Sequence, residues 1–172
     1  MKLHILCGIP GSGKSTLGSR LQGYVVSTDN LRKFLWNDEA VVQHDKLVFA
    51  LAKMIIAYLL SIGKDVIFDA TNLTAVKRKS IIMLGQKYQA QIILHWVNTP
   101  LQSALVRNST RERKVPTYVI KSLYKSFQTP RIKEGIKIIK IYNESLKLDK
   151  IITARLILKR SVFFSFPLNQ SC

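Results

Sequence analysis

A glycine-rich segment near the N-terminus contains the residues with the clearest chemistry. Residues 8–16 complete the pattern GxxxxGK[ST]. Glycines allow turns in which backbone N–H groups converge on an anion, and a following helix adds its positive end. Lys14 is expected between the β- and γ-phosphates of a nucleoside triphosphate, and the Ser15 hydroxyl is the expected Mg²⁺ ligand. The pattern predicts a phosphate loop made of Gly8, Ile9, Pro10, Gly11, Ser12, Gly13, Lys14, Ser15 and Thr16.

An aspartate follows the second predicted strand, residues 24–27. Asp29 comes fifteen residues after Lys14, and the carboxyl ends of neighbouring parallel strands share one crevice. Its carboxylate is placed to accept the proton of an attacking hydroxyl. Arg32 lies one helical turn later, where it either orients an acceptor phosphate or holds Asp29. The alternative is a helix-capping aspartate beside a surface arginine.

A second aspartate ends the next predicted strand, residues 65–68. Asp69 resembles an acidic group on the magnesium side of a phosphoryl-transfer site, and it is also placed to pair with Arg32 across the crevice. Asn72 follows three residues later. The alternative is a turn into the next helix, where Asx residues are common.

An arginine-rich segment at about residues 107–116 precedes a further predicted helix. It contains Arg107, Arg111 and Arg113. Such a segment can close over a triphosphate and neutralise charge in the transition state. We expect Arg111 to be the finger and Arg107 to be the second contact with the triphosphate. The alternative is a plain basic surface loop.

The elements that must position these residues alternate between strands and helices. Strands are predicted at residues 2–7, 24–27, 65–68, 90–97 and 136–142, and helices at 15–22, 30–36, 46–62, 75–87, 100–108 and 116–129. Asp45, Thr74 and Thr99 are the expected N-caps. This alternation predicts an α/β fold with a parallel five-stranded sheet covered on both faces. A further strand is possible at residues 151–159.

Charge is distributed unevenly along the chain. Residues 1–72 hold 8 basic and 6 acidic residues, whereas residues 73–172 hold 19 basic and 4 acidic residues. A strongly basic half favours a polyanionic partner, most commonly nucleic acid. A solvated basic surface is the alternative.

The remaining composition indicates one globular domain in a reducing cytoplasm. The chain has 172 residues, 47% of them apolar, and its two cysteines, Cys7 and Cys172, do not form a disulfide framework. The apolar stretch 47–62 is shorter than the roughly 20 residues that span a bilayer, so no membrane association is expected. His4 and His95 lie within predicted strands and are expected to be structural, and His44 is expected at the surface.

The ordered set of motifs resembles the kinase domain of the bacterial and phage polynucleotide 5′-kinases, with zeta-toxin and AAA-type small kinases as wider relatives. The matching stretches are residues 8–16, 27–32, 69–73, 106–111 with 115–116, and Pro130 with 134–135. The similarity spans roughly residues 1–142. It implies a P-loop NTPase domain at 1–143, with an adenylate-kinase-like three-layer α/β/α core, followed by an extension at 144–172.

The resemblance also implies roles for individual residues. Lys14 and Ser15 would hold the phosphates of ATP and Mg²⁺, and Asp29 would be the general base. Arg32 would contact the acceptor, and Arg111 would be the arginine of a small lid. Asp69, with Asn72 beside it, would support Arg32 or the acceptor site.

Three functions follow from these observations. The leading one is an ATP-dependent kinase acting on a nucleic-acid 5′-hydroxyl. A small-molecule kinase, acting on a metabolite, a sugar nucleotide or an antibiotic, is the second. A nucleotide-dependent switch that binds nucleic acid is the third. The sequence leaves open DNA versus RNA and the oligomeric state.

Overall fold

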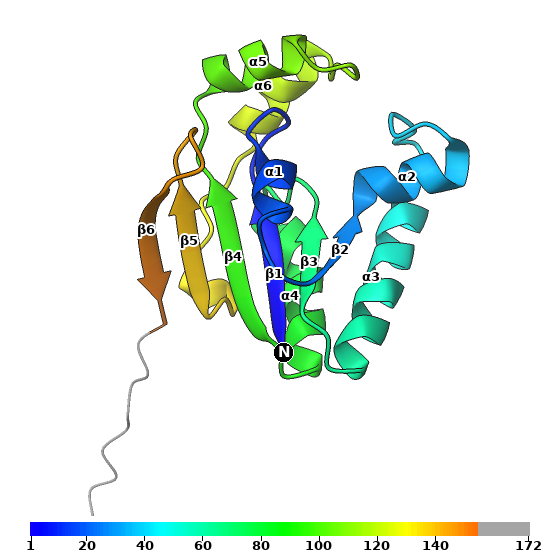
Figure 1. Cartoon of the computed structure of the whole chain (residues 1–172), viewed down its shortest axis with the longest axis vertical. Coiled ribbons are helices and arrows are strands. Elements are labelled where there is room, and N and C mark those ends of the chain that lie inside the picture. The colour runs from blue at the N-terminus through cyan, green and yellow to red at the C-terminus, as the bar shows by residue number, and fades with distance from the viewer. Residues whose placement is uncertain (155–172) are drawn as a thin grey trace, which may run out of the picture.

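The computed structural model describes residues 1–154, which form a six-stranded sheet with helices behind it and beyond one end of its strands (Figure 1). The strands are β1 (Lys2–Cys7), β2 (Tyr24–Ser27), β3 (Val66–Asp69), β4 (Gln91–Val97), β5 (Ile138–Tyr142) and β6 (Leu148–Thr153). The helices are α1 (Lys14–Gly18), α2 (Thr28–Trp36), α3 (Asp45–Ser61), α4 (Ala75–Lys87), α5 (Leu101–Ser109), α6 (Thr117–Lys125) and the 3₁₀ turn η1 (Ile132–Glu134). Within residues 1–154, no helix has the length and apolar character needed to cross a membrane.

The sheet is mixed, which corrects the expected five-stranded parallel sheet. Its order is β2-β3-β1-β4-β5-β6, and the first five strands are parallel. β6 pairs antiparallel with β5, because the turn at residues 143–147 is too short for a crossover. The strand expected at 151–159 therefore begins earlier, and its expected end lies outside the described residues. The predicted extension thus contributes a strand to the same sheet.

Parallel pairing brings the chemically important strand ends to one edge. β1 pairs with both β3 and β4, so the chain connections diverge on either side of β1. In open α/β sheets such a switch point opens the crevice that binds ligands. The phosphate loop follows β1 directly, and Ser27 at the end of β2 is in register with Asp69 at the end of β3.

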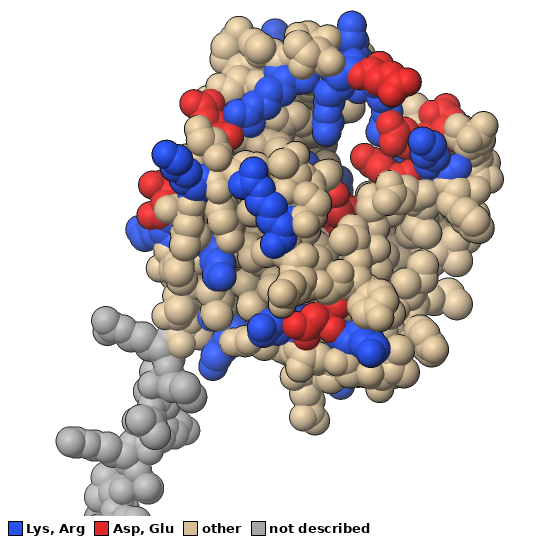
Figure 2. All heavy atoms as spheres, viewed as in Figure 1, with Lys and Arg blue, Asp and Glu red and all other residues tan. Residues whose placement is uncertain are grey.

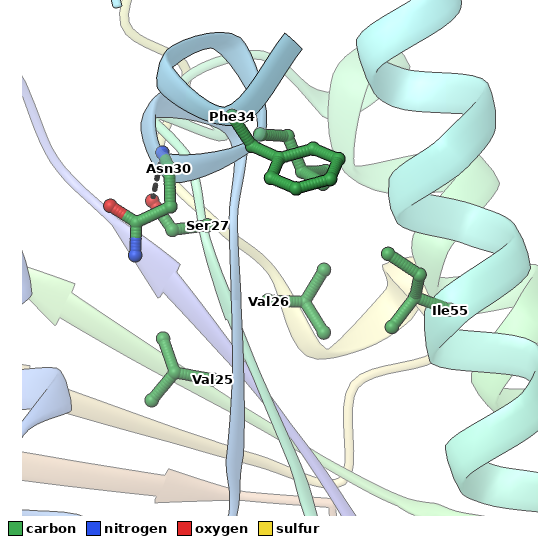
Figure 3. Close-up of a pocket in the computed structure, with 7 residues that line it drawn as sticks. Val25, Val26, Ser27, Asn30, Phe34 and Ile55 are labelled. Carbon is green, nitrogen blue, oxygen red and sulfur yellow. Dashed lines mark hydrogen bonds between the residues drawn. The ribbon is translucent and has the colours of Figure 1, made fainter. Parts of the chain in front are cut away.

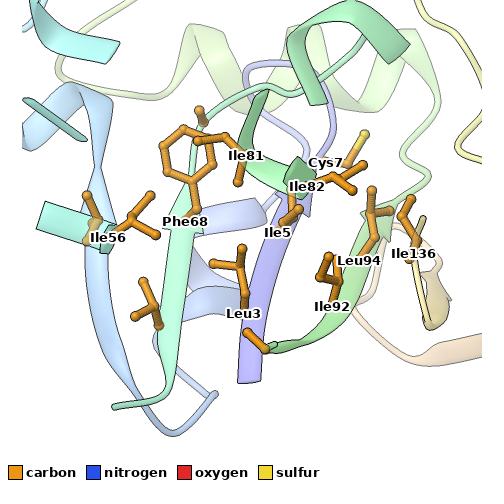
Figure 4. Packing of buried hydrophobic residues seen from close by; sticks show 14 of the residues in the cluster. Leu3, Ile5, Cys7, Ile56, Phe68, Ile81, Ile82, Ile92, Leu94 and Ile136 are labelled. Carbon is orange, nitrogen blue, oxygen red and sulfur yellow. The ribbon is translucent and has the colours of Figure 1, made fainter. Parts of the chain in front are cut away.

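The main hydrophobic core lies between the sheet and the helices α3 and α4 (Figure 4). Leu3 and Phe68 from the sheet meet Ile56 of α3 and Ile81 of α4, and all four are buried. Truncating such a side chain to alanine costs roughly 2–5 kcal/mol. This core fixes the strand ends that carry the site.

The opposite face of the sheet carries the short α1 and a chain of polar side chains. Leu17 of α1 packs with Val97 and Tyr142. His95 Nε2 lies 2.8 Å from His4 Nδ1, and His95 Nδ1 lies 3.1 Å from the Tyr142 hydroxyl. Both histidines are buried, which confirms their expected structural role.

Several element ends differ from the sequence expectations for identifiable reasons. α1 stops at Gly18 rather than at residue 22, because the chain continues in tighter turns after Leu17. Asp45 is the first residue of α3 rather than its cap, and its carboxylate instead accepts hydrogen bonds from Arg32. Thr99 does not cap α5, since its hydroxyl donates to the Ser12 carbonyl oxygen. Thr74 caps α4 as predicted.

The helix α6 and the strand β5 are both shorter than the sequence predicted. α6 ends at Lys125, not near residue 129, and β5 begins at Ile138 rather than at residue 136. The backbone N–H of Gln128 donates to the Leu73 carbonyl oxygen, so this stretch is tied to the loop after β3 and leaves the helical path.

Candidate active site

The phosphate loop adopts a backbone that only glycine accommodates easily. Gly13, the N-cap of α1, has φ 99°, in the left-handed region. Gly11 has φ 81°, and a Cβ there would collide with the Ala104 carbonyl oxygen of α5. The Gly8 N–H donates to the Thr71 carbonyl oxygen at 3.1 Å, which joins the loop to the end of β3. The loop is therefore built into the carboxyl edge of the sheet.

Side chains from outside the loop also fix its backbone at Ser12. The Thr99 hydroxyl donates to the Ser12 carbonyl oxygen at 2.9 Å, and Arg107 Nη1 donates to the same oxygen at 3.4 Å. The Ser12 Oγ is buried, and no hydrogen-bond partner lies near it among residues 1–154. A buried hydroxyl without a partner fits a loop whose partner is a bound oxyanion. The loop therefore fits the phosphates of a nucleotide.

Lys14 is buried at the start of α1 and points back along the loop. Its Nζ donates to the Ile9 carbonyl oxygen at 3.0 Å. Burial lowers the pKa of Lys14, the Asp69 and Asp29 carboxylates raise it, and the Arg111 guanidinium lowers it further. Two acidic side chains and one arginine from distant parts of the chain thus act electrostatically on one ammonium.

Ser15 is the residue most suited to Mg²⁺. It is exposed in the first turn of α1, directly after Lys14. Residues 1–154 contain no cluster of three or more His, Cys, Asp or Glu side chains that could hold a metal. Mg²⁺ commonly takes one or two protein oxygens and completes its shell with phosphate oxygens and water. The hydroxyl of Ser15 fits that mode of binding.

Asp29 lies in the first turn of α2 and is held by Arg32. Arg32 Nη1 donates to Asp29 Oδ1 at 2.6 Å. The Arg32 Nε and Nη2 both donate to Asp45 Oδ1, at 3.0 and 2.6 Å. Of the two roles predicted for Arg32, the structure shows the holding of Asp29. The predicted pairing of Arg32 with Asp69 is wrong, because Asp45 takes that place.

Asn72 links the end of β1 to the segment that follows β3. It is buried with φ 48°, and its Nδ2 donates to the carbonyl oxygens of Leu6 at 2.8 Å and Ala70 at 3.3 Å. Its amide nitrogen is thus used within the protein. Asp69 ends β3 and is half-buried.

The arginine segment, residues 107–116, runs from the last turn of α5 into a loop that is closed at its base. Asn108 Nδ2 donates to the Val115 carbonyl oxygen at 2.8 Å, and the Val115 N–H donates back to Asn108 Oδ1 at 3.0 Å. Arg111 is exposed at the tip. Arg113 Nη1 lies 3.5 Å from Asp29 Oδ2 and 3.6 Å from Glu39 Oε1. Arg113 is therefore the residue that spans the site.

One residue of structural importance was missed from the sequence. Arg78 is fully buried and forms a bidentate pair with Glu134, with N···O distances of 2.7 and 2.8 Å. Its Nη1 also donates to the carbonyl oxygens of Asn72, Leu73 and Gln128. The available signal was its position on the buried face of α4, with Ile81, Ile82 and Gly85 at helical spacing.

An apolar hollow lies on another side of α2 (Figure 3). Its lining includes Asn30 and Phe34, which are one helical turn apart. Asp29 and Arg32 share a different side of the same helix, and neither of them lines the hollow. The hollow is therefore separate from the phosphate-loop crevice.

The family of the chain follows from a comparison with known proteins. A family model described as an AAA domain matches residues 3–130, which include both the phosphate loop and the arginine segment. The chain belongs to this AAA-domain family. The resemblance to small P-loop kinases that was predicted from the sequence is thereby confirmed.

Three known proteins are similar to the AAA-domain chain, one in sequence and two in structure. L-seryl-tRNA(Sec) kinase of Methanococcus maripaludis is 27% identical over 142 residues, which cover 76% of this chain and 54% of that protein. The structure of the Pnkp1/Rnl/Hen1 RNA repair complex contains a chain that matches with TM-score 0.65 and 22% identity, over 73% of this chain and 43% of that one. The PezAT toxin–antitoxin system of Streptococcus pneumoniae contains a chain with TM-score 0.64 and 17% identity, over 87% and 70%.

These matches establish the α/β P-loop kinase fold for the AAA-domain chain. The two structural matches are below 25% identity and bear on the fold alone. The AAA-domain chain spans about half the length of the tRNA kinase that it matches.

Proposed function

We propose that the chain is an ATP-dependent kinase that transfers the γ-phosphate to the 5′-hydroxyl of a nucleic acid. The supporting observations are the buried Ser12 hydroxyl of the phosphate loop, which has no partner among residues 1–154, and the Asp29 carboxylate that Arg32 holds after β2. Phosphoryl transfer requires positive groups around the phosphates and a base beside the attacking oxygen. A switch that only binds nucleotide has no use for a carboxylate held at this strand end.

The residues divide the chemistry as follows. Residues 8–16 bind the phosphates of ATP, with Lys14 between the β- and γ-phosphates, and Arg107 steadies the loop at Ser12. Ser15 would hold Mg²⁺ together with the phosphates, and the ion would supply positive charge that offsets the charge of the triphosphate. Arg111 stabilises the charge that develops in the transition state.

On the acceptor side, Asp29 removes the proton. The acceptor oxygen attacks the γ-phosphorus, so a new O–P bond forms. The bond between that phosphorus and the β–γ bridging oxygen breaks, and the electron pair leaves with ADP. The hydroxyl proton passes to Asp29, which Arg32 holds in place. Asp69, at the end of β3, supports the acceptor site, and Asn72 ties this part of the chain to β1.

A nucleic-acid acceptor is supported by charge. Residues 73–172 hold 19 basic and 4 acidic residues. Figure 2 shows a notch whose upper rim carries Lys and Arg side chains next to acidic ones, with further acidic side chains on the side of α2. Phosphate backbones bind such surfaces through release of counterions. One relative is named for its action on L-seryl-tRNA, and another belongs to an RNA repair complex. A cytoplasmic setting is in keeping with Cys7, a buried free thiol.

Transfer of labelled γ-phosphate to a 5′-hydroxyl oligonucleotide tests the proposal. We expect transfer by the wild-type protein and a loss of about 10²–10⁴-fold in Asp29→Asn, because a positioned base contributes that much. Asp38→Asn is the matched control, since Asp38 is an exposed aspartate whose carboxylate accepts a hydrogen bond from the Ala40 N–H and, among residues 1–154, from no other group. Thermal unfolding of both variants checks that the loss is not one of folding.

Two outcomes contradict the proposal. Turnover of ATP without transfer to any DNA or RNA removes the nucleic-acid acceptor and favours a small-molecule hydroxyl instead. Equal transfer by Asp29→Asn and wild type removes Asp29 as the base.

A further inference from the structure

The acceptor side of the crevice contains two arginines that are bound very differently. The Arg32 side chain is 8% exposed, and each of its three nitrogens donates to a carboxylate at 3.0 Å or less. Moving it would leave Asp29 and Asp45 without their buried partner, which is costly. Arg32 is thus fixed as the residue that holds the base.

Arg113 is held weakly by comparison. Its side chain is 30% exposed, and its contacts with Asp29 and Glu39 are 3.5 and 3.6 Å long. Hydrogen bonds between ionised groups are usually 2.7–2.9 Å, and exposed ion pairs add little stability. Arg113 is therefore free to exchange one anionic partner for another.

The contact with Asp29 also gives Arg113 its place in the reaction. Arg32 occupies Oδ1 of Asp29, whereas Arg113 faces Oδ2. Oδ2 is the oxygen left for an incoming hydroxyl. An acceptor that reaches it must pass beside the Arg113 guanidinium and displace it from the carboxylate.

We propose that Arg113 binds an anionic group of the acceptor, namely the phosphodiester next to the hydroxyl that is phosphorylated. This inference rests on the proposed function. When the acceptor enters, the Arg113 guanidinium moves from Asp29 and Glu39 to that phosphate, which leaves Asp29 Oδ2 free to take the proton. The base of the arginine segment stays closed through Asn108 and Val115, so only the side chain and the loop tip need to move.

This arrangement selects acceptors by their charge. When a neutral acceptor enters, Arg113 loses its contacts with Asp29 and Glu39 and gains no other anion, so binding of the acceptor competes with the Arg113–Asp29 contact. An acceptor with a phosphate near its hydroxyl replaces one anion by another. The structure thus favours acceptors in which a phosphate lies close to the hydroxyl.

The contact between Arg113 and the acceptor phosphate is tested by removing the charge of the phosphate in the oligonucleotide and the charge of Arg113 in the protein. We compare a short 5′-hydroxyl oligonucleotide that has a native first linkage with one that has a neutral methylphosphonate there. Wild type should prefer the native linkage by about 10- to 100-fold in kcat/KM, the range for a hydrogen bond between charged groups. Arg113→Ala should lose most of that preference through KM for the native acceptor, while KM for ATP stays unchanged.

The controls separate Arg113 from general charge. Lys121→Ala removes one exposed positive charge from α6 and should keep the preference. Glu39→Gln removes the competing carboxylate that lies away from the base, and it should leave the preference intact with an equal or lower KM. If Arg113→Ala keeps the preference as Lys121→Ala does, Arg113 does not contact the phosphate.

Equilibrium binding distinguishes failure of this inference from failure of the proposed function. Affinity for both oligonucleotides is measured by calorimetry in the wild type and the Arg113→Ala variant. A preference for the native linkage that requires Arg113, without any phosphate transfer, supports the anion site and overturns the kinase activity. Transfer with a preference that does not require Arg113 overturns the anion site alone.

Discussion

Individual residues of this site differ in how readily the sequence alone identifies them. The sequence pointed to Lys14 and Asp29 because a local pattern and the order of the strands were enough to single them out, and their roles stay predictions. Arg78 was missed, and Arg113 was named only as a member of the arginine segment, because their partners come from other parts of the chain: Glu134 for Arg78, and Asp29 for Arg113. No sequence periodicity identifies which distant carboxylate an arginine meets. The assignment of Arg111 as the finger stays a prediction.

Arg78 gives the prediction at this scale. Arg78→Met should reduce the free energy of unfolding by about 3–5 kcal/mol, because it leaves Glu134 and three carbonyl oxygens without their partner in the interior. Urea denaturation measures the loss. Lys79→Met, at an exposed neighbouring position of α4, should change the free energy by less than about 0.5 kcal/mol. A similar small effect for Arg78→Met would show that the pair contributes little.

At the scale of elements, strands were easier to predict than the ends of helices. Apolar runs located all five parallel strands; β1 and β4 are buried along most of their length, as strands inside a parallel sheet are. Helix ends depended on tertiary contacts. Thr99 and Asp45 both have the residue types of caps, yet each bonds instead to a group brought near by the fold. The strand β6 was only partly predicted, since an edge strand with mixed polar residues has no distinctive pattern.

Three neighbouring strands share the buried chain His4–His95–Tyr142, which should make stability depend on pH. Burial, with help from the nearby His4 and Lys140 charges, lowers the pKa of His95 to about 3. In the unfolded chain it returns to about 6.5, so between these values the unfolded state binds more protons. The free energy of unfolding therefore falls as pH drops below about 6.5, by about 2 kcal/mol at about pH 5.

The test compares His95→Gln with wild type by urea denaturation at neutral pH and at about pH 5. The variant should lose less stability on acidification, by about 2 kcal/mol, although His4 keeps its own lowered pKa. His44→Gln, at an exposed position before α3, should behave like wild type. Parallel losses in all three proteins would assign the acid sensitivity to other groups.

On the scale of the whole molecule, the net charge of +17 bears on how a substrate is captured. If a nucleic acid is the acceptor, its affinity should fall as salt rises, with a log–log slope of about −0.7 for each phosphate contacted on a single strand. Measuring KM for the oligonucleotide between about 50 and 200 mM salt gives that slope. A flat response would indicate a neutral acceptor, and a nucleoside without phosphate provides the reference.

The position of Met1, at the end of the sheet toward which β6 returns, determines how the protein can be attached to a surface. Met1 precedes β1 at the end of the sheet remote from α5 and α6, and β6 runs back toward that same end (Figure 1). An affinity tag or a surface anchor attached ahead of Met1 would therefore lie at the end of the molecule opposite α5 and α6. A protein immobilised through that tag would turn the end with α5 and α6 toward the solution, so long polymers could reach this end without meeting the support.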